Sequence, residues 1–198
     1  MSLKMMLVAA LALVMVSCGG TGGGGNAAAQ KKSATASFRA ISAIGSTLVS
    51  PITSLLSNKP RLQAGGTVNL ECDKAGESGT VTVTSTDTSL ALVLKTSAAG
   101  CTESGTTVTT PAAGLSMTFK GSGNFDANYS FTLAIDGSAT ITTGSSTETF
   151  AYTKFSIQID VVQTGTSPSV TIIINGSVTS GGDTQTFNNE TYDSTELN

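Results

Sequence analysis

The sequence of 198 residues contains no histidine and no tryptophan. The absence of histidine excludes Ser-His-Asp and Cys-His catalysis in their usual forms, and it excludes histidine-ligated zinc. No phosphate-binding Gly-Lys-Ser/Thr loop occurs, and the carboxylates are scattered along the chain. We therefore expect a protein that is not an enzyme and that needs no cofactor or metal.

Aromatic residues make up only 5% of the chain, and charged residues 12%, about half the usual charged fraction. Thr, Ser and Gly take the polar positions instead. Low charge combined with regularly spaced β-branched residues favours sheet over disorder. Sugar-binding modules usually stack sugars on exposed aromatic rings. Only Tyr129, Tyr152 and Tyr192 are candidates for that role, because most Phe residues follow an apolar alternation.

Charge is divided unevenly along the chain. Residues 1–62 contain six Lys and Arg and no acid, whereas residues 63–198 contain thirteen acids and four lysines. A β-region with this excess of acidic residues would repel the phosphates of a nucleic acid, so we do not expect nucleic acid as a partner. The basic segment either keeps a tether soluble, which we favour, or attracts anionic lipid headgroups.

The N-terminus combines a positive residue, an apolar run and a cysteine. Lys4 precedes an uninterrupted apolar stretch over 5–16, and Ser17 precedes Cys18. The stretch is too short to span a bilayer, which takes about 20 residues, and it has the length of a signal-peptide core. The region predicts export from the cytoplasm.

These residues resemble the signal of a bacterial lipoprotein, with Met15 where leucine is usual. The resemblance implies cleavage before Cys18, lipid modification of Cys18 and anchoring in a membrane. Gly19, rather than aspartate, follows the cysteine and resembles the class sent to the outer membrane of Gram-negative bacteria. The alternative is an ordinary secretory signal in which Cys18 is incidental.

The remainder divides into three parts. Residues 18–32 form a tether rich in Gly and Ala, 33–58 a helix, and 63–198 an antiparallel β-domain that forms one globular unit with the helix. Removal of a signal peptide at 1–17 would leave 181 of the 198 residues, which is enough for one domain with a core.

The helix is predicted by an apolar stripe with steps of three and four residues. Pro51 interrupts the stripe without shifting its phase, which favours one kinked helix over two. Its other face is mostly Ser, Thr and Ala, with Arg39 as the cation, and this is weak for a membrane-surface helix. We expect the helix to pack on the sheet. The stripe consists of Phe38, Ile41, Ile44, Leu48, Ile52 and Leu55.

Two cysteines remain after Cys18. In an exported chain Cys72 and Cys101 predict one disulfide, closing a loop of 28 intervening residues. Chain-entropy estimates for such a loop give roughly 3–4 kcal/mol. The alternative is two free, buried thiols.

From Thr67 onward apolar residues alternate with Thr or Ser, as in strands with one apolar and one solvated face. Asp87-Thr88 and the stretch 121–128 predict turns between strands. After the glycines at 181–182 only 184–187 is typical of a strand. The alternation predicts seven or eight strands in total.

An internal similarity links Ile135-Asp136-Gly137-Ser138 with Ile174-Asn175-Gly176-Ser177. A two-residue hairpin at either Asx-Gly pair would place apolar residues opposite polar ones. Each pair therefore predicts a long strand with a glycine in its middle, where a bend or bulge curves the sheet. A change of alternation near Thr153-Lys154 predicts a further bulge.

The expected fold is mainly β: a long-stranded, antiparallel curved sheet or open barrel, with one N-terminal amphipathic helix packed on the apolar face. Sheet-on-sheet packing is the alternative. The expected function is that of a lipid-anchored envelope protein that acts as a structural or partner-binding component. One alternative is a carrier of lipid or another hydrophobic ligand between helix and sheet. An enzyme that uses carboxylates alone is the third and weakest hypothesis.

Overall fold

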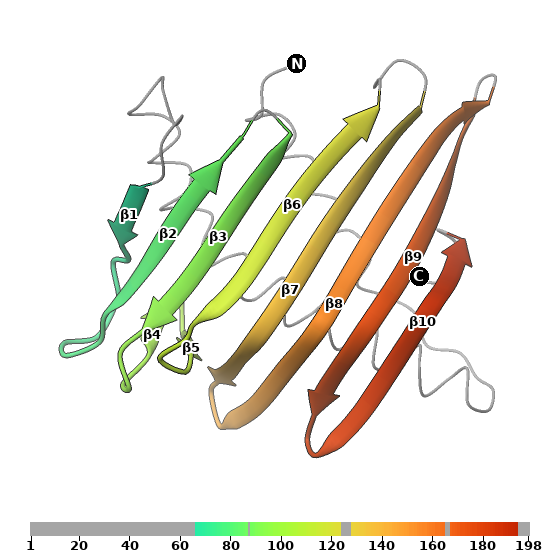
Figure 1. Cartoon of the computed structure of the whole chain (residues 1–198). Coiled ribbons are helices and arrows are strands. Elements are labelled where there is room, and N and C mark those ends of the chain that lie inside the picture. Colours follow the sequence, from blue (N-terminus) through green and yellow to red (C-terminus); the bar gives the residue numbers. More distant parts are fainter. Residues whose placement is uncertain (1–65, 87, 124–127, 165–166, 194–198) are drawn as a thin grey trace.

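The structure is a computed structural model that describes residues 66–193 apart from 87, 124–127 and 165–166 (Figure 1). The predicted signal peptide, tether and helix, over 1–58, lie outside the described residues. The described part is mainly β and contains no helix. Its strands form one antiparallel sheet of ten strands.

Eight strands lie side by side in the order β1-β2-β3-β6-β7-β8-β9-β10, and β4 and β5 form a hairpin outside that row. The sheet does not close into a barrel, because β1 and β10 lie at its opposite ends (Figure 1). The bounds are β1 Gly66–Asn69, β2 Gly79–Ser85, β3 Ser89–Thr96, β4 Cys101–Glu103, β5 Thr106–Thr109, β6 Leu115–Gly123, β7 Asn128–Thr143, β8 Ser146–Thr164, β9 Ser167–Ser180 and β10 Asp183–Asp193.

The prediction of seven or eight strands was too low. The strands it missed are β4 and β5, with three and four residues. Segments this short contain too few positions for an alternation to be visible. The prediction was also wrong for the last strand, because β10 extends to Asp193 rather than ending at Phe187.

Two strands, β6 and β5, pair with the same edge of the long strand β7. β6 pairs with its first part, from Tyr129 to Gly137, and β5 pairs with its last part, from Thr140 to Thr143. Between them, the Thr96 and Thr110 backbone N–H groups each donate to the hydroxyl of the other residue, at 3.0 and 2.9 Å. This exchange ties the end of β3 to the break between β5 and β6.

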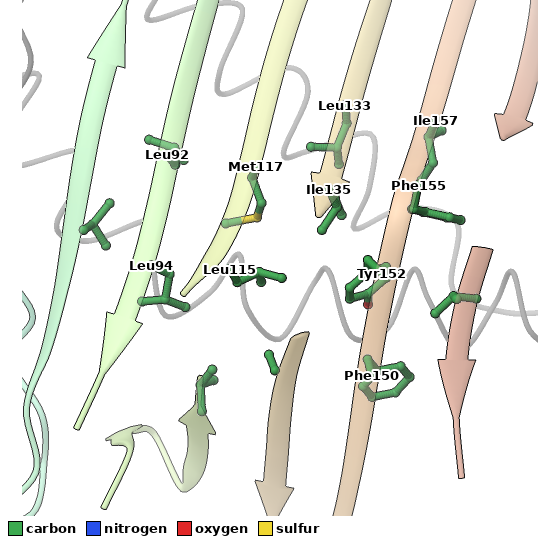
Figure 2. Packing of buried hydrophobic residues seen from close by; sticks show 14 of the residues in the cluster. Leu92, Leu94, Leu115, Met117, Leu133, Ile135, Phe150, Tyr152, Phe155 and Ile157 are labelled. Atoms are coloured by element: carbon green, nitrogen blue, oxygen red, sulfur yellow. The ribbon is translucent and has the colours of Figure 1, made fainter. Parts of the chain in front are cut away.

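The alternation gives the sheet two different faces, as predicted. Apolar side chains from β2 to β10 form one buried cluster, and ten of them are labelled in Figure 2. The opposite face is dominated by Thr, Ser and other small side chains. Strands of this kind form because β-branched residues suit a pleated surface that is buried on one side.

The predicted mid-strand glycines are confirmed. β7 runs through Gly137 and β9 runs through Gly176, without a turn at either position. The register slips opposite each of them, in β8 between Tyr152 and Phe155 opposite Gly137 and in β10 between Phe187 and Glu190 opposite Gly176. The same irregularity in β8 shifts its register with β9 between Thr153 and Ser156. The slip in β8 confirms the bulge predicted at Thr153-Lys154.

Candidate interaction surface

The Thr-rich face carries direct hydrogen bonds between threonine hydroxyls of neighbouring strands. Four such pairs are exposed, and their Oγ1–Oγ1 distances lie between 2.8 and 3.1 Å. Cross-strand Thr pairs of this kind stabilise a sheet modestly and hold both side chains in one rotamer. The pairs are Thr67–Thr82, Thr140–Thr149, Thr142–Thr147 and Thr179–Thr184.

The two faces also differ in aromatic content and charge. By register, every described aromatic residue lies on the apolar face. Lys95 and Lys120 occupy polar-face positions, opposite Thr80 and Thr132. Asp136 is exposed on the same face, and Asp160 lies there opposite Ser130. The polar face is therefore a sparsely charged array of small side chains, without rings on which a sugar could stack.

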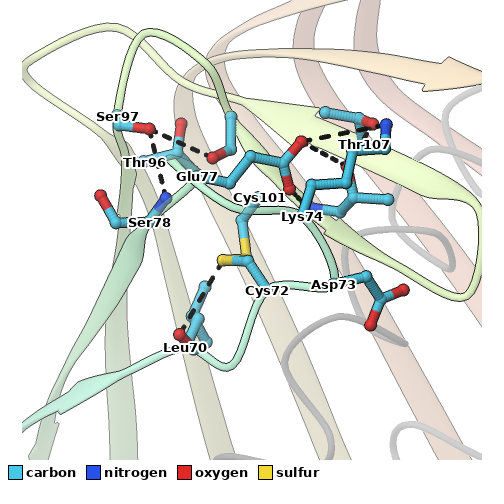
Figure 3. The surroundings of a disulfide bond; sticks show 12 residues. Leu70, Cys72, Asp73, Lys74, Glu77, Ser78, Thr96, Ser97, Cys101 and Thr107 are labelled. Carbon is cyan, nitrogen blue, oxygen red and sulfur yellow. Dashed lines mark hydrogen bonds and ion pairs between the residues drawn. A yellow bond between two sulfur atoms is a disulfide. The ribbon is translucent and has the colours of Figure 1, made fainter.

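The predicted disulfide is present at one corner of the sheet (Figure 3). Cys72 and Cys101 are joined with a Cα–Cα distance of 5.1 Å, and Cys101 is fully buried. Cys101 begins β4, whereas Cys72 lies in the loop that follows β1. The bond therefore joins that loop to the β4–β5 hairpin.

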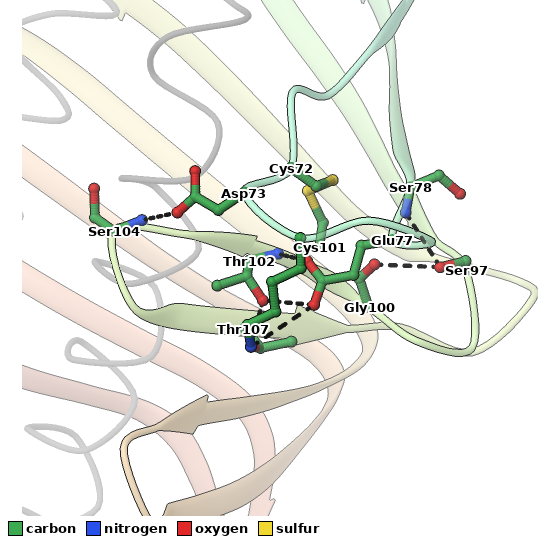
Figure 4. A network of polar contacts seen from close by, with 11 residues as sticks. Cys72, Asp73, Glu77, Ser78, Ser97, Gly100, Cys101, Thr102, Ser104 and Thr107 are labelled. Carbon is green, nitrogen blue, oxygen red and sulfur yellow. Dashed lines mark hydrogen bonds and ion pairs between the residues drawn. A yellow bond between two sulfur atoms is a disulfide. The ribbon is translucent and has the colours of Figure 1, made fainter.

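A carboxylate beside the disulfide organises the same corner (Figure 4). Glu77 accepts hydrogen bonds from the Thr102 backbone N–H at 2.6 Å and the Thr102 hydroxyl at 2.7 Å. Lys74 Nζ lies 4.0 Å from Glu77 Oε1. The hydrogen bond from the Thr102 hydroxyl is the main cause of the lowered pKa of Glu77, and burial acts in the opposite direction. Glu77 therefore stays ionised and holds the hairpin.

A second carboxylate completes this corner. Asp73 accepts a hydrogen bond from the Ser104 backbone N–H, in the turn between β4 and β5, at 2.9 Å. Burial, and then the charge of Asp73, raise the pKa of Glu103. The Asp73 and Glu77 carboxylates thus both accept hydrogen bonds from backbone N–H groups of the β4–β5 hairpin.

The two Asx-Gly pairs perform the same structural task in different strands. The Asp136 carboxylate accepts from the Lys154 backbone N–H at 3.0 Å, and the Asn175 side-chain oxygen accepts from the Asn189 N–H at 2.7 Å. Lys154 and Asn189 both have positive φ, 49° and 52°. Each Asx side chain thus stabilises a strained bulge in the next strand.

One polar atom in the apolar face lacks a partner. The Tyr152 hydroxyl is buried, and no described residue is hydrogen-bonded to it. Its ring lies between Phe150 and Phe155, with centroid distances of 6.4 and 5.5 Å. Burial raises the pKa of this hydroxyl far above its usual value. Tyr152 therefore donates to no described group and cannot stack against a sugar.

The structure brings together few of the residues considered from sequence. Cys18 lies outside the described residues, whereas Cys72 and Cys101 are joined. Within the described ranges no three or more His, Cys, Asp or Glu side chains are grouped as metal ligands require.

Sequence reasoning missed Glu77 and the hydroxyl of Tyr152. Glu77 lies in a loop, and nothing in its neighbourhood signals that it accepts from Thr102, 25 residues away. Tyr152 follows the apolar alternation, so the sequence predicts its burial but not the missing partner. The roles of Asp136 and Asn175 had a visible signal, namely the repeated Asx-Gly pair.

Comparison with family models, with curated proteins and with solved structures finds no match for this chain. The described ranges contain no helical stretch with the length and hydropathy that crossing a bilayer requires.

Proposed function

We propose that this chain is a lipid-anchored protein of the cell envelope that binds a partner through the polar face of its sheet, without catalysis. The observation that carries the proposal is the continuous, Thr-rich and sparsely charged face described above. Its cross-strand hydroxyl pairs hold the side chains in place, so little rotamer entropy remains to be lost on binding.

The size of this face is sufficient for a stable complex. Eight neighbouring strands span about 34 Å, and β6 is about 30 Å long, which gives about 1000 Å². A typical protein–protein interface buries about 800 Å² on each partner. The lack of aromatic rings on this face favours a protein partner over a glycan.

The anchor belongs to the same proposal. Lipid on Cys18 and a tether over 18–32 would hold the domain roughly 20 Å from the outer membrane by random-coil scaling. The predicted helix at 33–58 would pack on the apolar face of a curved sheet. The polar face is then left open to a partner.

Intact mass of protein purified from membranes tests the anchor. We expect residues 18–198 plus acyl groups, with no alkylated thiol before reduction. A mass without lipid would contradict the anchored location.

Site-specific photo-crosslinking in cells tests the polar face. A photoreactive residue at Thr118 should give a reproducible adduct with one partner, and Thr140→Glu should abolish it. Ser145→Glu, in the exposed turn between β7 and β8, is the matched control and should leave the adduct intact. Turnover of a substrate by the purified mature protein would contradict a purely binding role.

A second candidate function is that of a carrier for a hydrophobic ligand, and the unpartnered Tyr152 hydroxyl favours it. A buried hydroxyl without a partner is costly, and an acyl carbonyl or carboxylate seated on the apolar face could accept from it. Native mass spectrometry should then show lipid beyond the anchor, and Tyr152→Phe should reduce its occupancy. A protein free of such lipid excludes this function.

A further inference from the structure

The apolar face is covered more completely than one sheet can achieve by itself. Side chains on strands as far apart as β2 and β10 are almost fully inaccessible: Val81, Leu94, Phe155 and Ile174 are 0% exposed, and Phe187 is 1% exposed. A sheet must bury its apolar face against a second layer. The described strands form one layer, in which β4 and β5 pair with each other and β5 pairs with the end of β7. Another part of this chain must cover the face.

We propose that residues 34–57 form this second layer, crossing the strands with their C-terminal end over β1 and β2 and their N-terminal end over β8 to β10. The inference concerns the apolar face, and it does not depend on the partner proposed for the polar face.

The length of the segment suits this position. A helix of 24 residues is about 36 Å long at 1.5 Å per residue. The eight strands span about 34 Å. One helix can therefore reach across the whole sheet, and a kink at Pro51 allows it to follow a twisted surface.

The composition outside the described residues points to the same segment. Two stretches there are strongly apolar, residues 5–16 and residues 34–57. The first belongs to the predicted signal peptide and would be absent from the mature protein. The second has a stripe on one side only, as a helix between a sheet and solvent requires.

The chain connection determines the direction of crossing. Eight residues, 58–65, separate the segment from Gly66 at the start of β1. Fully extended, they reach at most about 27 Å. This distance is shorter than the sheet is wide, so a helix that crosses the whole sheet cannot have its C-terminal end over β9 and β10, and that end lies over β1 and β2. The N-terminal end then falls over β8 to β10.

Photo-crosslinking within the intact mature protein tests both the occupant and its direction. A photoreactive residue at Phe38 should form adducts with peptides from β8 to β10, and one at Leu55 with peptides from β1 to β3. The same residue at Ser46, on the far side of the stripe, should give neither. Adducts with co-purifying lipid, or with a second copy of the chain, would overturn the assignment. Exchange of the two patterns would overturn the direction.

A thermal unfolding comparison supplies a second measurement. Ile44→Asp places a charge on the stripe, and Ser46→Asp places the same charge two residues away on its opposite side. We expect Ile44→Asp to lower the midpoint by about 10 °C or more and Ser46→Asp to change it by about 2 °C or less. Equal shifts would overturn the proposal. Neither readout involves a partner on the polar face, so each proposal can fail separately.

Discussion

The corner around the disulfide and the half formed by β7 to β10 hold their backbones in shape by different means. At the corner, the loop after β1 has almost no sheet pairing, and the Cys72–Cys101 bond and the Glu77 carboxylate attach it to the β4–β5 hairpin. In the other half long strands pair continuously, and irregularity is confined to bulges opposite Gly137 and Gly176. The loop without sheet pairing is held by a disulfide and by hydrogen bonds to a carboxylate. The long strands are held by their own backbone hydrogen bonds, and glycines leave space for their bulges.

Both regions share one device, a short acidic or amide side chain that accepts from a backbone N–H far along the chain. Asp73 and Glu77 do so at the corner, and Asp136 and Asn175 do so at the bulges. Such bonds satisfy N–H groups that the ladder leaves out. The sparse carboxylates of this chain are thus used mainly for structure.

The largest effect is expected in the bulged half, at Gly176. Its φ is +88°, and a Cβ there would clash with the Lys154 carbonyl oxygen and the Phe155 Cα. Gly176→Ala should lower the free energy of unfolding by more than about 4 kcal/mol. Gly144→Ala, in a turn with φ +60° and open space around it, should cost about 1–2 kcal/mol. Chemical denaturation of both variants checks the difference, and similar losses would show that the bulge is adaptable.

The next effect is expected at the corner. Cys72→Ser with Cys101→Ser should cost roughly 3–4 kcal/mol, on the chain-entropy model for this loop. Hydrogen exchange should show that protection is lost in β4 and β5 and retained in β8 and β9. A uniform loss of protection would contradict the separation between the two regions.

The pH dependence should separate them further. The pKa of Glu77 is lowered in the folded state, so its contribution to stability is present above the usual glutamate pKa and is lost as pH falls through the folded value. Acid should therefore loosen the corner before the bulged half. Glu77→Gln should remove this dependence, while Glu148→Gln, at an exposed position, should leave it unchanged. Amide exchange measured from neutral to acidic pH provides the test.

The smallest effects are expected at the Asx side chains of the bulges. Asp136→Ala and Asn175→Ala each remove one hydrogen bond to a backbone N–H and should cost about 1 kcal/mol. Asp136→Asn keeps an acceptor oxygen and should cost about half of that or less. Denaturant melts of the three variants give the comparison. If Asp136→Asn costs as much as Asp136→Ala, the charge of Asp136 rather than its hydrogen bond supports that bulge.

The regular part of the fold was predictable because its physical cause is local. Alternation identified β2, β3 and β6 to β9, and the parity of residues around Gly137 and Gly176 showed that these strands continue. Cysteine count and export predicted the Cys72–Cys101 bond. The strand predictions depend only on residues that are close in the sequence. The disulfide prediction depends on a residue type that mainly forms disulfides in exported proteins.

The missed features depend on contacts between distant residues. Pairing of β5 with β7 is decided in space, since Thr106 meets Thr143 across 37 positions. The prediction ended β10 too early because the bulge at Asn188-Asn189 interrupts the alternation. Before the bulge an odd-numbered residue, Phe187, faces the core, and after it the even-numbered Glu190 and Tyr192 lie on that side. The same holds for Glu77, whose partner is Thr102.

The order of the strands has a consequence for how the chain folds. From β6 to β10 every strand pairs with its neighbour in the sequence, so this half can grow by successive hairpin additions with little loop entropy to overcome. Among the described strands, only the pairing of β3 with β6 and of β5 with β7 skips over an intervening strand. We therefore expect the C-terminal meander to assemble rapidly and β1 to β3 to join it in the rate-limiting step.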